Sequence, residues 1–253
     1  MTELLFILFT GLAFGSFITC ASYRLPLGID VVKKPSFCPQ CNTKLGFKDL
    51  WPVASWVAFR GTCRHCHAKI PARYPAIELA TAAVFLLLYS QYGFTLTTLI
   101  LALMAVMLLI MIVADLEHYI IPDSVHVVLL PLGVLYHWQR GTPWDEPLAG
   151  FLLASFIGLA LHYGYGWIRK KDVLGFGDVK FLAVVGLWLG LAALPFFLFL
   201  AGLLGVAFGL IWRALTKSPV FPFGPSLAAA LFVCVVFPSV IDMFWDIGGL
   251  IIK

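Results

Sequence analysis

Charged residues are scarce in this chain. Only 12% of its 253 residues are Asp, Glu, Lys or Arg, whereas 61% are hydrophobic and the mean hydropathy is +0.96. A water-soluble domain carries about one charged residue in four, so the composition excludes a soluble protein and indicates an integral membrane protein. The lipid bilayer is therefore an expected partner. The net charge of +4 is small and gives no reason to expect a nucleic-acid partner.

Several sequence patterns are also missing. The apolar residues 1–19 have neither a basic start nor a small-residue cleavage site, so we expect a first membrane span there and no cleaved signal peptide. Strict two-residue alternation of apolar and polar residues is absent, which argues against a membrane β-barrel. The chain has no fixed-period repeat and no Gly-rich GxGxxG fingerprint for a nucleotide. Helical spans remain as the expected architecture.

Apolar segments long enough to cross a bilayer recur along the chain. A transmembrane helix needs about 20 apolar residues, and we count eight candidates. The fourth and sixth are short, and Pro131 and Pro195 make their edges uncertain. The sequence therefore predicts an all-α polytopic membrane protein with about eight transmembrane helices. The candidates are 4–22, 74–90, 96–114, 124–138, 148–168, 179–193, 196–212 and 226–244.

Lysine and arginine lie almost entirely in alternate connections between these segments. Nine lie in residues 21–73, four in residues 169–180 and two just after the seventh segment, whereas only Arg140 and Lys253 fall in the other connections. Basic connections stay in the cytosol. We therefore predict that the basic side is cytosolic and that both termini lie outside.

Two aspartates stand at the boundaries of apolar segments. Asp115 follows the run 96–114, and Asp178 opens another run after Gly175-Phe-Gly. A carboxylate in or beside hydrocarbon is costly and is a functional-site hypothesis by default. Helix capping is the simpler alternative; it suits Asp178 at a helix start but not Asp115 at a helix end, where a carboxylate opposes the helix dipole. The predicted orientation puts both aspartates at the cytosolic boundary.

Paired carboxylates allow three functional hypotheses. In a peptidase, an ionised carboxylate draws a proton from the attacking water while a protonated one stabilises the developing oxyanion and helps the amine to leave. In a proton- or cation-coupled transporter the same groups would bind the ion, although such sites usually lie near the bilayer midplane. In an assembly scaffold the two aspartates would have no chemical role.

The only sizeable soluble segment, residues 21–73, contains two CxxC pairs. Two such turns bring four thiolates to one ion in the tetrahedral arrangement that structural zinc prefers. A redox pair and inert thiols remain as alternatives, and His65 and His67 could replace a thiolate. Cytosolic cysteines stay reduced, which disfavours disulfides. We predict a small zinc-ribbon-like insertion between the first two helices, with the metal ligands Cys38, Cys41, Cys63 and Cys66.

A set of short motifs runs in order over almost the whole chain. The motifs are Gly15-Ser-Phe17 with Tyr23-Arg-Leu-Pro26, Ser36-Phe-Cys-Pro-Gln-Cys41, Ser55-Trp56, Arg60-Gly-Thr-Cys-Arg-His-Cys66, Ile70-Pro-Ala-Arg-Tyr-Pro75, Glu78, Ala114-Asp115 with Ile121-Pro-Asp123, Gly175-Phe-Gly-Asp178-Val-Lys180, and Phe223-Gly-Pro225. With these motifs the chain resembles the type IV prepilin peptidases, the bifunctional leader peptidase and N-methyltransferase enzymes of bacterial inner membranes.

The resemblance implies two reactions at the cytosolic face of the inner membrane. One is cleavage of the basic leader of prepilins and pseudopilins after a glycine, with Asp115 and Asp178 as the catalytic pair of an aspartyl protease. The other is methylation of the new N-terminal residue from S-adenosylmethionine. Residues alone reveal no binding site for this methyl donor. An enzyme with the peptidase activity only is the runner-up.

Four candidate supporting residues lie close in sequence to this pair. Gly175 and Gly177 permit a tight loop or unusual backbone angles. Lys180 is either a boundary residue whose ammonium reaches the interface or a counter-ion of the pair. Asp123 fits a helix cap better than a direct catalytic role.

Glu78 and Arg73 are two more candidates, at the start of the second predicted span. An intramembrane glutamate is a functional candidate, although Glu78 could instead reach the nearby interface. Arg73 could pair with Glu78 or with an acidic substrate position. These assignments give three predicted regions: the first transmembrane helix (1–22), a cytosolic four-cysteine loop domain associated with methyl transfer by resemblance (23–73), and a membrane peptidase domain (74–253).

Overall fold

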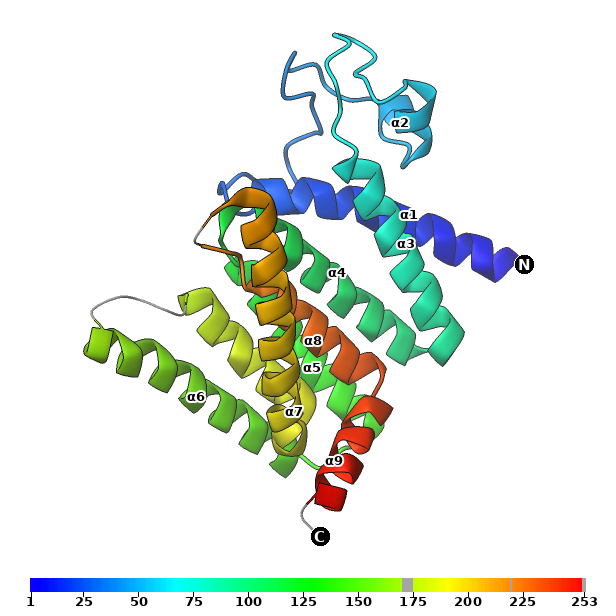
Figure 1. Cartoon of the computed structure of the whole chain (residues 1–253). Coiled ribbons are helices and arrows are strands. Elements are labelled where there is room, and N and C mark those ends of the chain that lie inside the picture. The colour runs from blue at the N-terminus through cyan, green and yellow to red at the C-terminus, as the bar shows by residue number, and fades with distance from the viewer. Residues whose placement is uncertain (170–174, 219, 252–253) are drawn as a thin grey trace. The chain divides into compact units, whose positions relative to one another are not determined.

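A computed structural model of the chain describes residues 1–169, 175–218 and 220–251 (Figure 1). The described residues form helices and two isolated β-bridges, and no extended strand. The chain divides into two compact units, residues 1–113 and 114–253. In chain order the elements are α1 (Thr2–Arg24), the 3₁₀ helix η1 (Phe47–Asp49), α2 (Ala54–Ala58), α3 (Arg73–Tyr92), α4 (Leu96–His118), α5 (Asp123–Arg140), α6 (Asp145–Arg169), α7 (Phe176–Thr216), α8 (Gly224–Val236) and α9 (Ser239–Ile251).

A close crossing of α1 and α3 organises the first unit. A Cβ atom added to Gly15 would lie 2.4 Å from the Cα atom of Glu78, and one added to Gly11 would lie 2.6 Å from the Cα atom of Ala82. Small residues one turn apart allow two membrane helices to approach this closely. The crossing therefore depends on both glycines, and it fixes the backbone that carries Glu78.

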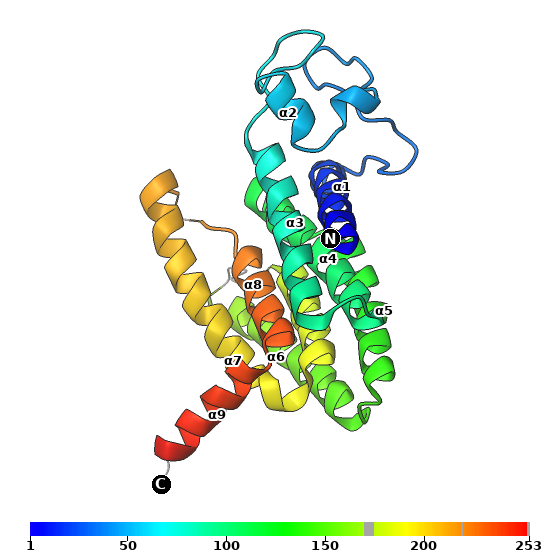
Figure 2. The same ribbon diagram turned by 90° about the vertical axis from the view of Figure 1, so that its right-hand side faces the viewer.

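The connection between α1 and α3 is tied to the end of α1. Arg24 is buried, and its guanidinium donates to the carbonyl oxygens of Asp30, Lys34 and Pro35 at 3.2, 2.7 and 2.9 Å. Figure 2 shows the connection, with η1 and α2, gathered beyond one end of α3. The predicted division into residues 1–22, 23–73 and 74–253 stays a prediction.

The second unit is organised around α7, which packs against α5, α6 and α8. Gly190 has non-helical backbone angles (φ 72°, ψ −178°) that divide α7 into two arms, and the second arm turns back in roughly the opposite direction (Figures 1 and 2). The side chain of His137 lies with Nε2 2.8 Å from the carbonyl oxygen of Leu187. This carbonyl precedes the break and would otherwise lose its helical partner.

Helices long and apolar enough to cross a membrane number four among the described residues, or five if the bent pair formed by α8 and α9 counts as one span. The four are α1, α4, residues 145–164 of α6, and α7. Seven of the eight predicted segments lie within helices, and two of these seven, 179–193 and 196–212, are the two arms of α7. The eighth, 226–244, covers parts of α8 and α9, which meet at a bend of 91°. The chain is therefore an all-helical protein with several candidate membrane spans, and the number eight stays a prediction.

Candidate active site

Asp115 lies in the last turn of α4 and is only 6% exposed. The helix ends just after it, because Tyr119 adopts the left-handed region (φ 56°) while its N–H still bonds to the Asp115 carbonyl oxygen at 2.9 Å. The Asp115 carboxylate is also held. Its Oδ2 atom accepts a hydrogen bond of 2.7 Å from the backbone N–H of Gly224, the first residue of α8.

Asp178 lies in the first turn of α7 and is partly exposed. Its N–H donates to the carbonyl oxygen of Gly175, the N-cap residue, at 3.0 Å. The carboxylates of Asp178 and Asp115 are near enough for their charges to interact. The ends of two helices thus bring together two carboxylates, and such a pair can share a single proton.

Lys180 and Asp123 form an ion pair beside Asp178. The Lys180 Nζ atom lies 2.6 Å from Asp123 Oδ1, and it also lies 5.2 Å from the centre of the Phe176 ring. Asp123 is the first residue of α5, and its carboxylate is 72% exposed. The hydrogen bond from Lys180 lowers the pKa of the Asp123 carboxyl. The ammonium of Lys180 therefore has a carboxylate partner outside the Asp115–Asp178 pair.

The two glycines before Asp178 allow close approach of other groups. Gly175 has ordinary extended angles (φ −60°, ψ 144°), so the expected unusual backbone does not occur there. A Cβ atom on Gly175 would lie 3.2 Å from Asp178 Oδ2, and one on Gly177 would lie 3.1 Å from the Cβ atom of Ile121. Small size at both positions lets the start of α7 pack against its surroundings.

Glu78 and Arg73 belong to the first unit. Glu78 is 7% exposed, and its Oε2 atom accepts a hydrogen bond of 2.7 Å from the N–H of Val53; its carboxylate also bonds to the Ser16 side chain. The carboxylate thus points inside the unit and does not reach its surface. Arg73 is exposed and donates to the Tyr74 hydroxyl at 3.4 Å.

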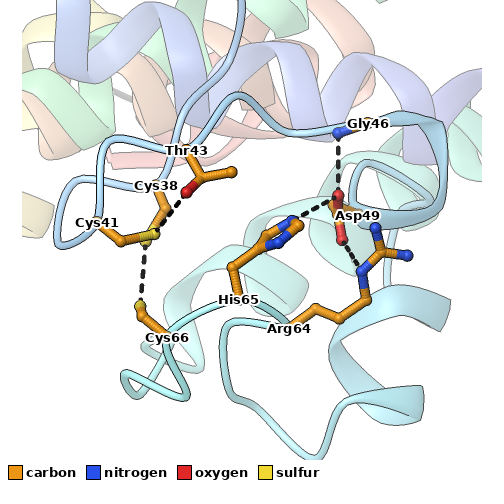
Figure 3. A network of polar contacts seen from close by, with 8 residues as sticks. All are labelled: Cys38, Cys41, Thr43, Gly46, Asp49, Arg64, His65 and Cys66. Atoms are coloured by element: carbon orange, nitrogen blue, oxygen red, sulfur yellow. Dashed lines mark hydrogen bonds and ion pairs between the residues drawn. The ribbon is translucent and has the colours of Figure 1, made fainter.

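The four cysteines converge on one point, and Figure 3 shows three of them, Cys38, Cys41 and Cys66. Their sulfur atoms all lie within 4.8 Å of one another, and those of Cys38 and Cys66 are 3.9 Å apart. Four thiolates around a tetrahedral zinc ion would be separated by about 3.8 Å. The donor set therefore fits a structural metal ion, which is what the sequence predicts for Cys38, Cys41, Cys63 and Cys66.

The two CxxC turns have the same local geometry. The N–H of Cys38 donates to Thr43 and the N–H of Cys63 donates to Ala68, at 3.0 and 2.8 Å, across the two β-bridges. Each turn is closed by a residue at positive φ that follows the second cysteine directly. Hydrogen bonds with Thr43 lower the pKa of the Cys41 thiol to about 6, which favours the thiolate that a metal requires.

Asp49 is a structural residue that the sequence did not indicate. Its side chain is 7% exposed; Oδ2 accepts from the N–H of Gly46 at 2.9 Å, while Oδ1 lies 3.4 Å from Arg64 Nε (Figure 3). His65 Nε2 is 3.6 Å from Oδ2. His65 therefore faces Asp49, and the cluster of possible ligands among the described residues contains the cysteines only.

Two family models match the chain. Residues 9–92 match the bacterial peptidase A24 N-terminal domain, and residues 101–210 match the type IV leader peptidase family. No solved structure matches the chain.

Curated relatives match over most of their length. A "Prepilin leader peptidase/N-methyltransferase" of Aeromonas salmonicida is 34% identical over 218 residues, which are 83% of this chain and 74% of the relative. A "Type 4 prepilin-like proteins leader peptide-processing enzyme" of Escherichia coli O78:H11 is 31% identical over 243 residues, 86% of this chain and 88% of the relative. The chain belongs to the type IV leader peptidase family.

Proposed function

We propose that the chain is a prepilin leader peptidase and N-methyltransferase that uses Asp115 and Asp178 as its catalytic pair. The observation that carries the peptidase half is the meeting of these two carboxylates, whose charges interact. The name of the Aeromonas salmonicida relative includes both activities, and that of the Escherichia coli relative includes leader-peptide processing. The substrates would be prepilins and pseudopilins with a basic N-terminal leader, cleaved after a glycine.

The two carboxylates would divide the work of peptide hydrolysis. The ionised one takes a proton from a water molecule, and the resulting hydroxide attacks the carbonyl carbon of the scissile bond. The protonated one stabilises the negative charge that forms on the carbonyl oxygen, and the C–N bond then breaks as the amine accepts a proton. Because one proton serves both groups, the acid and base roles belong to the pair.

The cytosolic face of the inner membrane is the proposed location of this site. Asp115 ends an apolar helix and Asp178 begins another, and the basic segment 169–180 includes Asp178. A basic connection of this kind stays in the cytosol. With about eight spans, as the sequence predicts, the leader of a substrate would remain in the cytosol while its apolar segment lies in the bilayer.

Zinc is the proposed ion of the four-cysteine cluster. The closed set of four thiols leaves no position for a substrate, so the ion would stabilise a zinc-ribbon-like loop domain and take no part in the chemistry. This domain is the proposed region for methyl transfer.

S-adenosylmethionine would supply the methyl group. A groove of about 830 Å³ lies between α1 and residues 47–58, and its lining includes Phe9, Leu12, Trp51 and Val57. None of the lining residues is ionisable, although the donor carries both a carboxylate and an ammonium. The groove therefore does not fit the donor, and we assign it no binding residues.

A synthetic prepilin-like peptide tests both activities. The purified protein is incubated with the peptide, with and without S-adenosylmethionine, and the products are read by mass spectrometry. We expect cleavage in both cases and a methylated N-terminus only with the donor. Asp115→Asn and Asp178→Asn should each reduce cleavage by at least about 100-fold, whereas Asp242→Asn, an exposed aspartate in α9, should not. Retained cleavage in either site variant would contradict the catalytic assignment.

A further inference from the structure

The first residue of α8 makes a contact with Asp115 that the assigned chemistry does not explain. The N–H of Gly224 donates to Asp115 Oδ2 over 2.7 Å, in a buried position and across 109 residues of sequence. Asp115 lies at the carboxyl end of α4, where exposed carbonyl groups oppose a negative charge. The amino end of α8 provides the opposite polarity and a directed donor.

A side chain at position 224 has no room beside this carboxylate. A Cβ atom on Gly224 would lie 2.7 Å from Asp115 Oδ2 and 3.0 Å from Asp115 Cγ. The backbone of Gly224 is not in the left-handed region, so conformation alone does not require glycine there. The carboxylate itself requires it, since Asp115 would have to rotate away and lose the hydrogen bond.

The donor is fixed from its other side as well. Phe223 packs on the second arm of α7, where a Cβ atom on Gly205 would lie 2.5 Å from the Phe223 ring. The following turns of α8 are packed inside the unit, where Leu227, Ala228 and Leu231 are buried. Because these contacts hold α8 in place, a larger residue 224 would displace the Asp115 side chain instead of the helix.

We propose that Gly224 is a positioning residue of the peptidase site. Its N–H holds the Asp115 carboxylate toward Asp178, and its lack of a side chain makes this contact possible. The inference rests on the proposed function, because it assigns Gly224 a role in cleavage. It also explains why the middle residue of the Phe223-Gly-Pro225 motif is glycine.

Gly224→Ala tests the inference, with Gly202→Ala as the matched control. Gly202 is an exposed helical residue of α7 with nothing within 4 Å of an added Cβ atom. Cleavage and methylation of an already cleaved peptide are measured on the purified full chain. We expect Gly224→Ala to lower kcat for cleavage at least about tenfold with unchanged KM and unchanged methylation, since a displacement of about 1 Å can cost about a hundredfold. Gly202→Ala should leave kcat within about twofold of wild type.

An Asp115→Asn background separates positioning from a general loss of folding. There Gly224→Ala should produce no further loss of residual cleavage, because the positioned group is already absent. If Gly224→Ala does not fold, the double variant Gly224→Ala/Asp115→Ala should restore folding, because the crowded carboxylate is gone.

Three outcomes would overturn the inference. They are cleavage by Gly224→Ala at the rate of Gly202→Ala, an equal loss of cleavage and methylation, or a folding defect that Asp115→Ala does not relieve. Absence of cleavage by the wild-type protein would instead overturn the proposed function, and this inference with it.

Discussion

Removal of the Glu78 carboxylate should loosen the turn around Val53. Glu78→Ala leaves the Val53 N–H without the acceptor that it now has at 2.7 Å. Val53 is a β-branched residue at positive φ (57°), a conformation that persists only where neighbouring contacts impose it. The same turn begins α2 and borders the apolar groove against α1.

The magnitude follows from the bond that is lost. A hydrogen bond to a charged group contributes about 1.5–3 kcal/mol, whereas the strain at Val53 is present in both proteins and cancels from the difference. Burial of the Glu78 carboxylate opposes the hydrogen-bond contribution, because desolvation makes the wild-type arrangement less favourable. A net change of about 2 kcal/mol raises the population of the opened turn by about 30-fold.

Amide hydrogen exchange of the protein in nanodiscs measures this population. Peptides that cover residues 47–58 should exchange about 30 times faster in Glu78→Ala, while peptides from residues 96–113 keep their wild-type rate. Glu78→Gln retains an oxygen that can accept from Val53, so it should exchange within a few-fold of wild type and serves as the matched control. Wild-type exchange of residues 47–58 in Glu78→Ala, or equal acceleration in both variants, would refute the reasoning.

Three further predictions concern the cysteine cluster and the ion pair. Protein purified without chelator should contain about one zinc ion per chain by elemental analysis, and metal-free wild-type protein would contradict the prediction. Cys63→Ser should lose the zinc ion, whereas Cys234→Ser, at a buried cysteine of α8, should keep it. Exchange of the charges in Asp123→Lys/Lys180→Asp should restore the cleavage that either single change reduces, and additive losses would count against the pair. The lowered pKa of Asp123 means that the contribution of this pair to stability is present above about pH 4 and is lost as the pH falls further. This titration does not extend to alkaline pH, so the alkaline limb of the cleavage pH profile of Asp123→Asn should match that of the wild type.

Features with a strong local signal could be predicted from the sequence. The double CxxC pattern predicted the four-cysteine cluster, and apolar runs predicted helices such as α1 and α4. The two carboxylates at the ends of apolar segments predicted a shared site, since a charge beside hydrocarbon is costly and indicates a function. The catalytic roles of Asp115 and Asp178 stay a prediction.

Long-range contacts had no such signal. Gly224 lies 109 residues from Asp115, and no local sequence pattern indicates that its N–H donates to that carboxylate. Asp49 looked like one ordinary acid in a basic loop, yet it joins the first half of the loop to Arg64. The sequence could not identify the partner of Lys180 either, because Asp123 is 57 residues away.

The break at Gly190 sets the direction in which the chain leaves α7. A continuous helix over residues 176–216 would carry its end away from its start, but the reversal at Gly190 folds the segment into a hairpin of two arms (Figure 1). Gly224 can then lie against Asp115, which interacts with Asp178 at the start of α7. A side chain at position 190, at φ 72°, would be strained there and would favour a straight helix, which would carry α8 away from Asp115.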